Sequence, residues 1–357
     1  MKRMNFRRFT ILLLASLLVL PLFSTPAKAA EIAATDMYYP VDMDDHWAYD
    51  ALDNFINADL LRGYVDHEGT VTVKPNHSIS RAEFVSILVR ALGLTSDASG
   101  TAFTDVKQGK WYFEPIRIAS SLGIVNGMSE TTFGPNQLIK RGEIATMIVN
   151  AFSSSVSFEG TAKSFKDVPE YYAKQAIQKA SQAGIVQGAS ATQFKPFANA
   201  KRAEAVVMLQ RALDLQSSAL PEDDQLKAVI LNLEKTWNQA INDKAYDRFH
   251  DVDAQFYTGY GLANSKYHSD ELIDLVKQGF EFKVEKVSEQ KLTVTHKSDR
   301  FAVVESTGGS VKMTMTKDDS FSANTISSDG IYLLKKMSDN SWKIYVTFLE
   351  EEQEQEQ

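Results

Sequence analysis

The spacing of apolar residues changes once along the chain. Up to about residue 277, several stretches repeat apolar residues every three to four positions, which predicts amphipathic helices. From about residue 280, apolar and polar residues alternate, which predicts strands with one buried face. The chain is therefore expected to be multidomain, with a helical part first and an α+β part at its C-terminal end.

The helical part contains an internal repeat. Three helix starts read SRAE, KRGE and KRAE, and their Arg residues are 60 and 61 positions apart. A Pro lies six residues before each Arg, a Gly lies before the Pro, and an aromatic residue and an Asp come earlier still. In chain order the landmarks are Asp42, Trp47, Gly63, Pro75 and Arg81; Asp105, Trp111, Gly127, Pro135 and Arg141; and Asp167, Tyr172, Gly188, Pro196 and Arg202. Each unit is predicted to form two helices, which need neighbouring units to bury their apolar faces.

These units resemble S-layer homology repeats. The resemblance covers repeat one (36–96), repeat two (101–155) and repeat three (163–216), and it rests on "FTDV", "GIVNG", the "FGPN" loop and the three Arg-containing boxes. It implies an all-α pseudo-threefold bundle of three repeats with grooves between them. It also implies that the grooves bind secondary cell-wall polymer, often pyruvylated, on Gram-positive peptidoglycan. Such a protein would be secreted and held without a covalent bond at the cell wall or S-layer.

Several residues of the repeats suit an anionic sugar. Arg presents a planar set of donors that matches a carboxylate, and a helix N-terminus adds backbone donors. Exposed aromatic rings can lie against a sugar ring, and Gly permits close backbone approach. The candidate ligand-binding residues are Arg81, Arg141, Arg202, Trp47, Trp111, Tyr172, Gly63, Gly127, Gly188, Lys140 and Lys201.

A structural interpretation of the same residues stays open. Arg81, Arg141 and Arg202, with the Glu two residues after each, could link the three repeats at the centre of the bundle, and the aromatic residues could be packing residues. Ser80 can form a capping box with Glu83. Lys140 and Lys201 replace this Ser in the other repeats, and a Lys side chain has no acceptor, so those two boxes are predicted to be incomplete.

The C-terminal third is predicted to follow a linker at residues 217–224. Helices are predicted over 225–246, 245–257 and 269–279, the last with Ser269 as its cap and Gly279 as its stop. Six strands are predicted: FEFKVEKV, KLTVTH, FAVVES, VKMTMT, GIYLLKKM and WKIYVTFL. Residues 225–350 resemble the nuclear-transport-factor-two-like fold, which implies a small α+β domain with a curved antiparallel sheet and a cone-shaped pocket. An acidic tail follows at 351–357.

The residues supply little catalytic chemistry. The chain has no Cys, and no catalytic or phosphate-binding motif is present. His250, Asp251 and Asp253 could form an acid–base pair or a weak metal site, or simply a solvated helix end. We therefore predict a binding protein with no catalytic residues, metal or cofactor. The alternatives are a wall-anchored enzyme with a small-molecule pocket in the α+β domain, and a structural surface protein that self-associates through the C-terminal sheet.

The N-terminus and the charge limit the location and partners. A basic start, a short apolar run and the sequence Ala27-Lys28-Ala29 predict a secretory signal peptide at residues 1–29. No later segment is apolar enough to predict a membrane span. The net charge is −8, and it becomes −13 without the five basic residues of the signal peptide. Such an acidic chain is not expected to bind nucleic acid.

Overall fold

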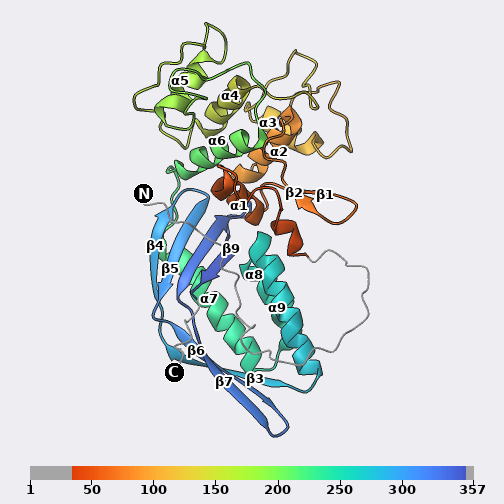
Figure 1. Cartoon of the computed structure of the whole chain (residues 1–357), viewed down its shortest axis with the longest axis vertical. Coiled ribbons are helices and arrows are strands. Elements are labelled where there is room, and N and C mark those ends of the chain that lie inside the picture. Colours follow the sequence, from red (N-terminus) through yellow and green to blue (C-terminus); the bar gives the residue numbers. More distant parts are fainter. Residues whose placement is uncertain (1–33, 351–357) are drawn as a thin grey trace.

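The computed structural model describes residues 34–350, so the predicted signal peptide and acidic tail lie outside the described residues. Each repeat contains two helices, as expected (Figure 1). They are α1 (Tyr49–Asn57) and α2 (Arg81–Leu92), α3 (Phe113–Ser121) and α4 (Arg141–Phe152), and α5 (Lys174–Gln182) and α6 (Arg202–Asp214). A short 3-10 helix, η2 (Asp36–Tyr38), precedes α1.

Repeat one also contains a two-stranded antiparallel hairpin, β1 (Tyr64–Val65) and β2 (Val71–Thr72). The prediction of an all-α bundle therefore misses this hairpin. Its physical origin is the loop between Gly63 and Pro75, which is four residues longer than the matching loops of the other repeats.

The six helices of the repeats share one core. The second helix of each repeat packs against the first helix of the next: α2 contacts α3, α4 contacts α5, and α6 contacts α1. The contacts thus close into a ring, and a single buried cluster runs through all three repeats. A two-helix unit alone could not bury these faces, which is why the repeats stabilise one another. The pseudo-threefold symmetry implied by the family resemblance stays a prediction.

The helix starts follow the expected capping chemistry. Ser80 Oγ accepts the Glu83 amide at 3.2 Å, and Glu83 Oε2 accepts the Ser80 amide at 2.8 Å, a complete capping box. In α4 and α6 only the Glu half can form, because Lys has no side-chain acceptor. Glu143 Oε2 accepts the Lys140 amide at 2.7 Å, and Glu204 Oε2 accepts the Lys201 amide at 2.9 Å.

The Asp landmark of each repeat holds the loop before the second helix. The carboxylate accepts two successive backbone N–H groups of that loop at 2.7–2.9 Å. Asp42 accepts those of Val73 and Lys74, Asp105 those of Phe133 and Gly134, and Asp167 those of Phe194 and Lys195. Burial alone would raise the pKa of Asp105 and Asp167 above 3.8, but the backbone donors outweigh it and lower both pKa values.

Replacing Asp105 and Asp167 together by Asn is therefore expected to destabilise the protein more near neutral pH than in acid. A carboxylate whose pKa is lowered by folding contributes stability that is present above its ordinary pKa of 3.8 and is lost as the pH falls through the lower, folded-state pKa. Urea unfolding at about pH 7 and about pH 3 would measure the difference. Asp97→Asn, at an exposed loop residue, is the control. Equal destabilisation at both pH values would contradict the assignment.

The C-terminal domain packs helices against two antiparallel sheets. The helices are α7 (Asp223–Asn242), η3 (Tyr246–Arg248), α8 (Phe249–Phe256) and α9 (Gly259–Lys277). The strands are β3 (Glu281–Ser288), β4 (Lys291–Lys297), β5 (Phe301–Thr307), β6 (Ser310–Lys317), β7 (Ser320–Ser327), β8 (Gly330–Lys336) and β9 (Trp342–Leu349). They form one sheet in the order β3-β6-β7 and another in the order β4-β5-β8-β9.

Two predictions for this domain are wrong in detail. The six predicted strands are present, but β7 is a seventh, and the strands form two sheets rather than one. Helix α9 begins at Gly259, ten residues before the predicted cap. Ser269 lies within the helix and is fully buried, where its hydroxyl donates to Asp253 Oδ2 at 2.7 Å.

The two domains are in direct contact (Figure 1). Four residues of the C-terminal domain belong to the core cluster of the repeats: Tyr260, Phe301, Tyr345 and Val346. Tyr345 donates to Asn54 Oδ1 on α1 at 2.6 Å, and Lys335 Nζ donates to the carbonyl of Ala58 at the end of α1. The predicted linker is held as well, since Asp299 accepts from the backbone of both Ser218 and Ala219.

Candidate functional site

The three landmark Arg residues lie buried where the repeats meet. Each is only 4–5% exposed, and each reaches into the neighbouring repeat. Arg81 pairs with Glu143 at 2.6 Å, Arg141 pairs with Glu204, and Arg202 pairs with Glu83 at 3.0 Å. We call these contacts junctions 1–2, 2–3 and 3–1. They form a closed ring of ion pairs that links all three repeats.

The Arg donors are largely used inside the protein. Arg81 Nε donates to the Phe133 carbonyl at 3.0 Å, and Nη2 donates to the Asn126 carbonyl at 3.2 Å. Arg202 makes the matching bonds to the carbonyls of Val73 and Arg62. Arg141 Nε donates to the Phe194 carbonyl at 2.8 Å. These Arg side chains therefore lie between the repeats and point inward, where they link neighbouring repeats.

The first amides of the three second helices also have partners. The amide after each Arg donates to the carbonyl of a landmark Pro in another repeat: Ala82 to Pro135, Gly142 to Pro196, and Ala203 to Pro75. The amide of each Arg donates to the carbonyl of the residue two positions after that Pro. The first two N–H groups of α2, α4 and α6 are therefore already used in contacts between the repeats.

The predicted aromatic residues are exposed. Trp47 is 65% exposed, Trp111 61% and Tyr172 70%. Burial of part of its ring raises the pKa of Tyr172, with a further contribution from Glu143 and an opposing one from Arg81. A Cβ at Gly142 would lie 2.3 Å from the hydroxyl of Tyr171, so the segment that carries Tyr172 lies against the start of α4. Flat rings that are open to solvent are suitable surfaces for stacking a sugar ring.

The candidate Lys residues lie at the surface, whereas the candidate Gly residues lie in tightly packed loops. Lys140 and Lys201 are exposed, and Lys140 Nζ donates to Asn199 Oδ1 at 2.6 Å. The glycines are needed by the loops themselves. A Cβ at Gly63 would lie 2.7 Å from Val71 Cγ1, and one at Gly127 would lie 2.3 Å from the Ser129 carbonyl oxygen. Gly188 has a φ of +85°, which favours Gly over other residues.

Sequence reasoning missed the aromatic rings that cover the buried Arg residues. Phe133 lies against Arg81 and Phe194 against Arg141, with ring-to-guanidinium distances of 4.7 and 4.9 Å. At junction 3–1 the hairpin supplies Tyr64 instead, 4.8 Å from Arg202, and its hydroxyl donates to Glu83 Oε1 at 2.6 Å. The available signal was the Phe two residues before Pro in "TFGP" and "QFKP", which is Val in "VTVKP".

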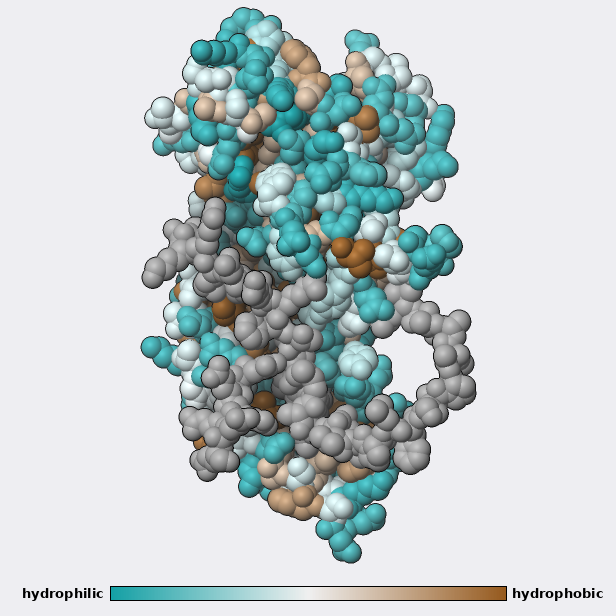
Figure 2. Space-filling view, viewed as in Figure 1, coloured by the Kyte–Doolittle hydropathy of each residue, from teal (hydrophilic) through white to brown (hydrophobic). Residues whose placement is uncertain are grey.

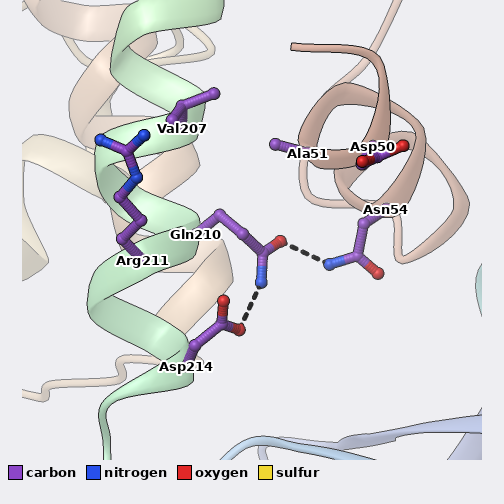
Figure 3. Close-up of a pocket in the computed structure, with 7 residues that line it drawn as sticks. All are labelled: Asp50, Ala51, Asn54, Val207, Gln210, Arg211 and Asp214. Atoms are coloured by element: carbon purple, nitrogen blue, oxygen red, sulfur yellow. Dashed lines mark hydrogen bonds between the residues drawn. The ribbon is translucent and has the colours of Figure 1, made fainter. Parts of the chain in front are cut away.

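An open cavity of about 340 Å³ lies between α1 and α6 (Figure 3). It is lined by Asp50, Ala51, Asn54, Val207, Gln210, Arg211 and Asp214, none of which was predicted. Asn54 donates to Gln210 at 2.5 Å, and Gln210 donates to Asp214 at 2.7 Å, as the dashed lines in Figure 3 mark. Burial raises the pKa of Asp214. These polar groups satisfy one another across the contact between repeats one and three.

The acidic cluster of the C-terminal domain ties two helices together. Asp253 on α8 is fully buried and accepts the hydroxyls of Ser265 and Ser269 on α9 at 2.5 and 2.7 Å. His250 is 45% exposed at its side chain and lies 3.9 Å from Asp253 and 3.0 Å from Asp270. No group of three potential metal ligands occurs within residues 34–350. In the same described range, no helix is long and apolar enough to cross a membrane.

Known proteins match the helical part of the chain. The S-layer homology domain family matches residues 102–145 and 164–206. The exoglucanase XynX of Acetivibrio thermocellus is 29% identical over 178 residues, which is 48% of this chain and 16% of the relative. A surface-layer 125 kDa protein of Lysinibacillus sphaericus is 30% identical over 202 residues, 55% of this chain and 16% of the relative. A cellulosome-anchoring protein of A. thermocellus is 28% identical over 165 residues, 44% of this chain and 36% of the relative.

The matches therefore span a small part of these longer relatives, whose enzymatic names do not transfer to this chain. Among solved structures, the intermembrane space region of the chloroplast protein ARC6 aligns with 36% of this chain and all of its own, at 16% identity. Its TM-score of 0.30 is too low to support an inference about the C-terminal fold. Residues 102–145 and 164–206 therefore carry S-layer homology repeats, as surface-layer and cellulosome-anchoring relatives do, and these matches support a location at the cell surface.

Proposed function

We propose that the three repeats, including residues 36–96, anchor this protein to the cell wall of a Gram-positive bacterium by binding its secondary cell-wall polymer. The observation that carries the proposal is the set of three aromatic rings, Trp47, Trp111 and Tyr172, which occupy the same position in each repeat and are 61–70% exposed. An apolar ring left open to solvent at three equivalent positions suits stacking against sugar rings. The C-terminal α+β domain is then an accessory domain fixed to the anchor.

We further propose that exposed Lys residues, rather than the buried Arg residues, meet the anionic groups of the polymer, such as pyruvyl carboxylates. Lys140 is the N-cap residue of α4, and Tyr171, next to Tyr172 in the chain, lies against Gly142 in the first turn of that helix, beside junction 1–2. By correspondence between repeats, Lys201 and Trp47 would share junction 2–3, and Ser80 and Trp111 would share junction 3–1. Two of the three grooves would then hold both a cation and an aromatic ring. The Arg residues would act as positioning residues that hold the repeats together.

The test is co-sedimentation of the protein with purified cell walls, either intact or stripped of secondary polymer. Binding is expected only to intact walls and is expected to weaken at high salt. The double variant Lys140→Ala/Lys201→Ala is expected to lower affinity about tenfold or more, since charge-assisted hydrogen bonds contribute about 1.5–3 kcal/mol. Tyr172→Ala and Trp47→Ala should each weaken binding as well.

Lys179→Ala is the matched control, because Lys179 is an exposed Lys in the last turn of α5, away from the helix starts. It removes one positive charge, as each of the two Lys→Ala changes does, and should leave wall binding unchanged. Equal binding to intact and stripped walls would refute polymer recognition. A loss of binding free energy for Lys179→Ala half as large as that for the double variant would show that only net charge matters.

A further inference from the structure

The cavity between α1 and α6 has a lining that suits a small polar ligand. Its volume of about 340 Å³ falls in the range of small-molecule sites, about 300–1,000 Å³. Ala51 and Val207 supply short apolar side chains at one end, and polar side chains line the remainder (Figure 3). In Figure 2 the visible face of the repeats is mostly hydrophilic, with small apolar patches. These surroundings favour a ligand with many hydroxyl groups over an apolar one.

Hydrogen bonds run in one direction through the cavity, starting from the C-terminal domain. Tyr345 on β9 donates its hydroxyl to Asn54 Oδ1 at 2.6 Å. Asn54 Nδ2 donates to Gln210 Oε1 at 2.5 Å, and Gln210 Nε2 donates to Asp214 Oδ1 at 2.7 Å. A primary amide has two N–H groups, so within the described residues each amide keeps one N–H for a ligand. A sugar hydroxyl can accept from such an N–H and donate to a carboxylate such as that of Asp214.

The charges of the lining disfavour an anionic ligand. Asp50 and Asp214 each contribute a carboxylate, which would repel a like charge. Arg211 extends along α6 toward Val207 rather than toward these carboxylates, and it donates to the Ile185 carbonyl at 3.3 Å (Figure 3). Its guanidinium is thereby used within repeat three. The lining therefore fits an uncharged ligand.

The amides of the cavity have no counterparts at the matching contacts of the other repeats. Gln210 lies eight residues after the landmark Arg of its repeat, where the other repeats have Val89 and Val149. Asn54 lies seven residues after the landmark aromatic residue of its repeat, where repeat two has Ile118. Val89 and Val149 are 7% and 8% exposed and belong to the shared core. Apolar residues therefore suffice to pack the repeats here, so the polar pair serves something other than packing between repeats.

The cavity continues the groove proposed for the polymer at junction 2–3. The aromatic residue and the Lys of that groove stand at the starts of α1 and α6. In Figure 3, Ala51 points toward Val207. Further along, Asn54 points toward Gln210, so the two helices run in the same direction. The cavity thus lies about one to two turns beyond the helix starts, or about 5–11 Å, and a polymer held at those starts reaches it.

We propose that this cavity is a subsite for an uncharged sugar unit of the wall polymer, and that Tyr345 is its positioning residue. The inference rests on the proposed anchoring function and concerns the unit that follows the one held at Trp47 and Lys201. The Tyr345 hydroxyl fixes the orientation of the Asn54 amide, and through it that of Gln210. The C-terminal domain thereby contributes to anchoring without touching the polymer.

The first test compares the affinity of the parent protein and of Gln210→Val for intact walls by co-sedimentation. The substitution installs the residue type of the other two repeats and changes no charge. Since it removes a donor and an acceptor from the subsite, affinity should fall about three- to tenfold. Gln239→Val is the matched control, because the exposed Gln239 on α7 also donates to an Asp four residues later, Asp243, at 3.3 Å.

The control should bind walls as the parent does, and an equal loss for both variants would overturn the proposal. The outcomes also separate the subsite from the anchoring function on which it rests. If the parent does not bind intact walls, the anchoring function fails. If the parent binds and Gln210→Val binds equally well, anchoring stands and the subsite fails.

The second test examines whether the unit is uncharged. Polymer released from the walls and reduced at its carboxyl groups to alcohols serves as a soluble competitor for wall binding. It should compete for the parent and for Lys140→Ala/Lys201→Ala, and clearly less for Gln210→Val. A reduced polymer that competes equally with the parent and with Gln210→Val would overturn the assignment of an uncharged unit.

The third test concerns Tyr345. Tyr345→Phe keeps the ring and removes the donor to Asn54, so it should weaken wall binding about twofold or more. In the Gln210→Val background its effect should be smaller, because the chain of amides is already broken. Effects that multiply in full would show that Tyr345 does not act through these amides, and would overturn its positioning role.

Discussion

Replacing Arg81 by Ala is expected to lower the free energy of unfolding by about 3–5 kcal/mol. The Arg81 side chain is 4% exposed and its partner Glu143 is 17% exposed. Loss of the Arg81 side chain would leave the Glu143 carboxylate without its cation. It would also remove the donors to the carbonyls of Phe133 and Asn126. Breaking one partner of a buried ion pair costs far more than the pair contributes, because the remaining charge stays desolvated. Urea unfolding followed by circular dichroism would measure the change.

Two further variants make this prediction specific to burial. Lys174→Ala breaks an ion pair with Glu170 in which the carboxylate is 85% exposed, so it should cost less than about 1 kcal/mol. Glu143→Gln keeps an acceptor for the Lys140 amide but removes the charge. Combined with Arg81→Ala, it should give a smaller loss than the sum of the two single changes. A loss for Arg81→Ala no larger than that for Lys174→Ala would contradict the assigned role.

The result also separates folding from ligand binding. If the Arg81→Ala variant loses wall binding only in proportion to its unfolded fraction, Arg81 is a positioning residue. Lys140→Ala should instead reduce binding while leaving the unfolding free energy within about 0.5 kcal/mol of the parent, because its side chain is exposed. Lys140 directly precedes Arg141, the counterpart of Arg81 in repeat two, so burial is what distinguishes the two kinds of residue.

The internal repeat made the helices of the first part predictable from sequence. The burial of each candidate ligand-binding side chain could not be predicted in the same way. Landmarks repeated in the same order three times located all six helices and the family. They could not reveal which way Arg81 turns, because that depends on carbonyls 45 and 52 residues away. The same holds for the Asp landmarks, whose role as loop anchors became evident only from their backbone partners. Exposed Trp47 and Trp111 could not be distinguished from packing residues by spacing alone.

The C-terminal domain shows where local pattern is insufficient. Strand β7 was missed because SFSANTIS lacks regular alternation, and it pairs with β6 at the edge of the sheet. The start of α9 was missed because Gly259 and Gly261 favour a loop reading. Gly259 has a φ of +57°, and a Cβ there would lie 2.1 Å from the Asn57 carbonyl oxygen of repeat one. This Gly permits close contact between the domains, which no local pattern encodes.

Replacing Phe301 by Ala is expected to destabilise both domains together by about 3–5 kcal/mol. Phe301 begins β5 and is 6% exposed, yet it belongs to the core cluster of the repeats and packs edge-on against Tyr345 with a centroid distance of 6.0 Å. Removing its ring opens a cavity at the boundary, which weakens the packing of both sides. Because the core is shared, heating should give one calorimetric transition for the parent and one, at lower temperature, for the variant.

Phe321→Ala is the control for this change, since the ring on β7 is 70% exposed and its removal should cost less than about 0.5 kcal/mol. Trp47 and Trp111 report on the repeats, and Trp237 and Trp342 on the C-terminal domain, so fluorescence of paired Trp→Phe variants can follow each domain separately. Coincident midpoints would show that the C-terminal domain and the repeats stabilise one another. Two separated transitions, only one of which shifts in Phe301→Ala, would mean that the domains unfold independently despite their common core.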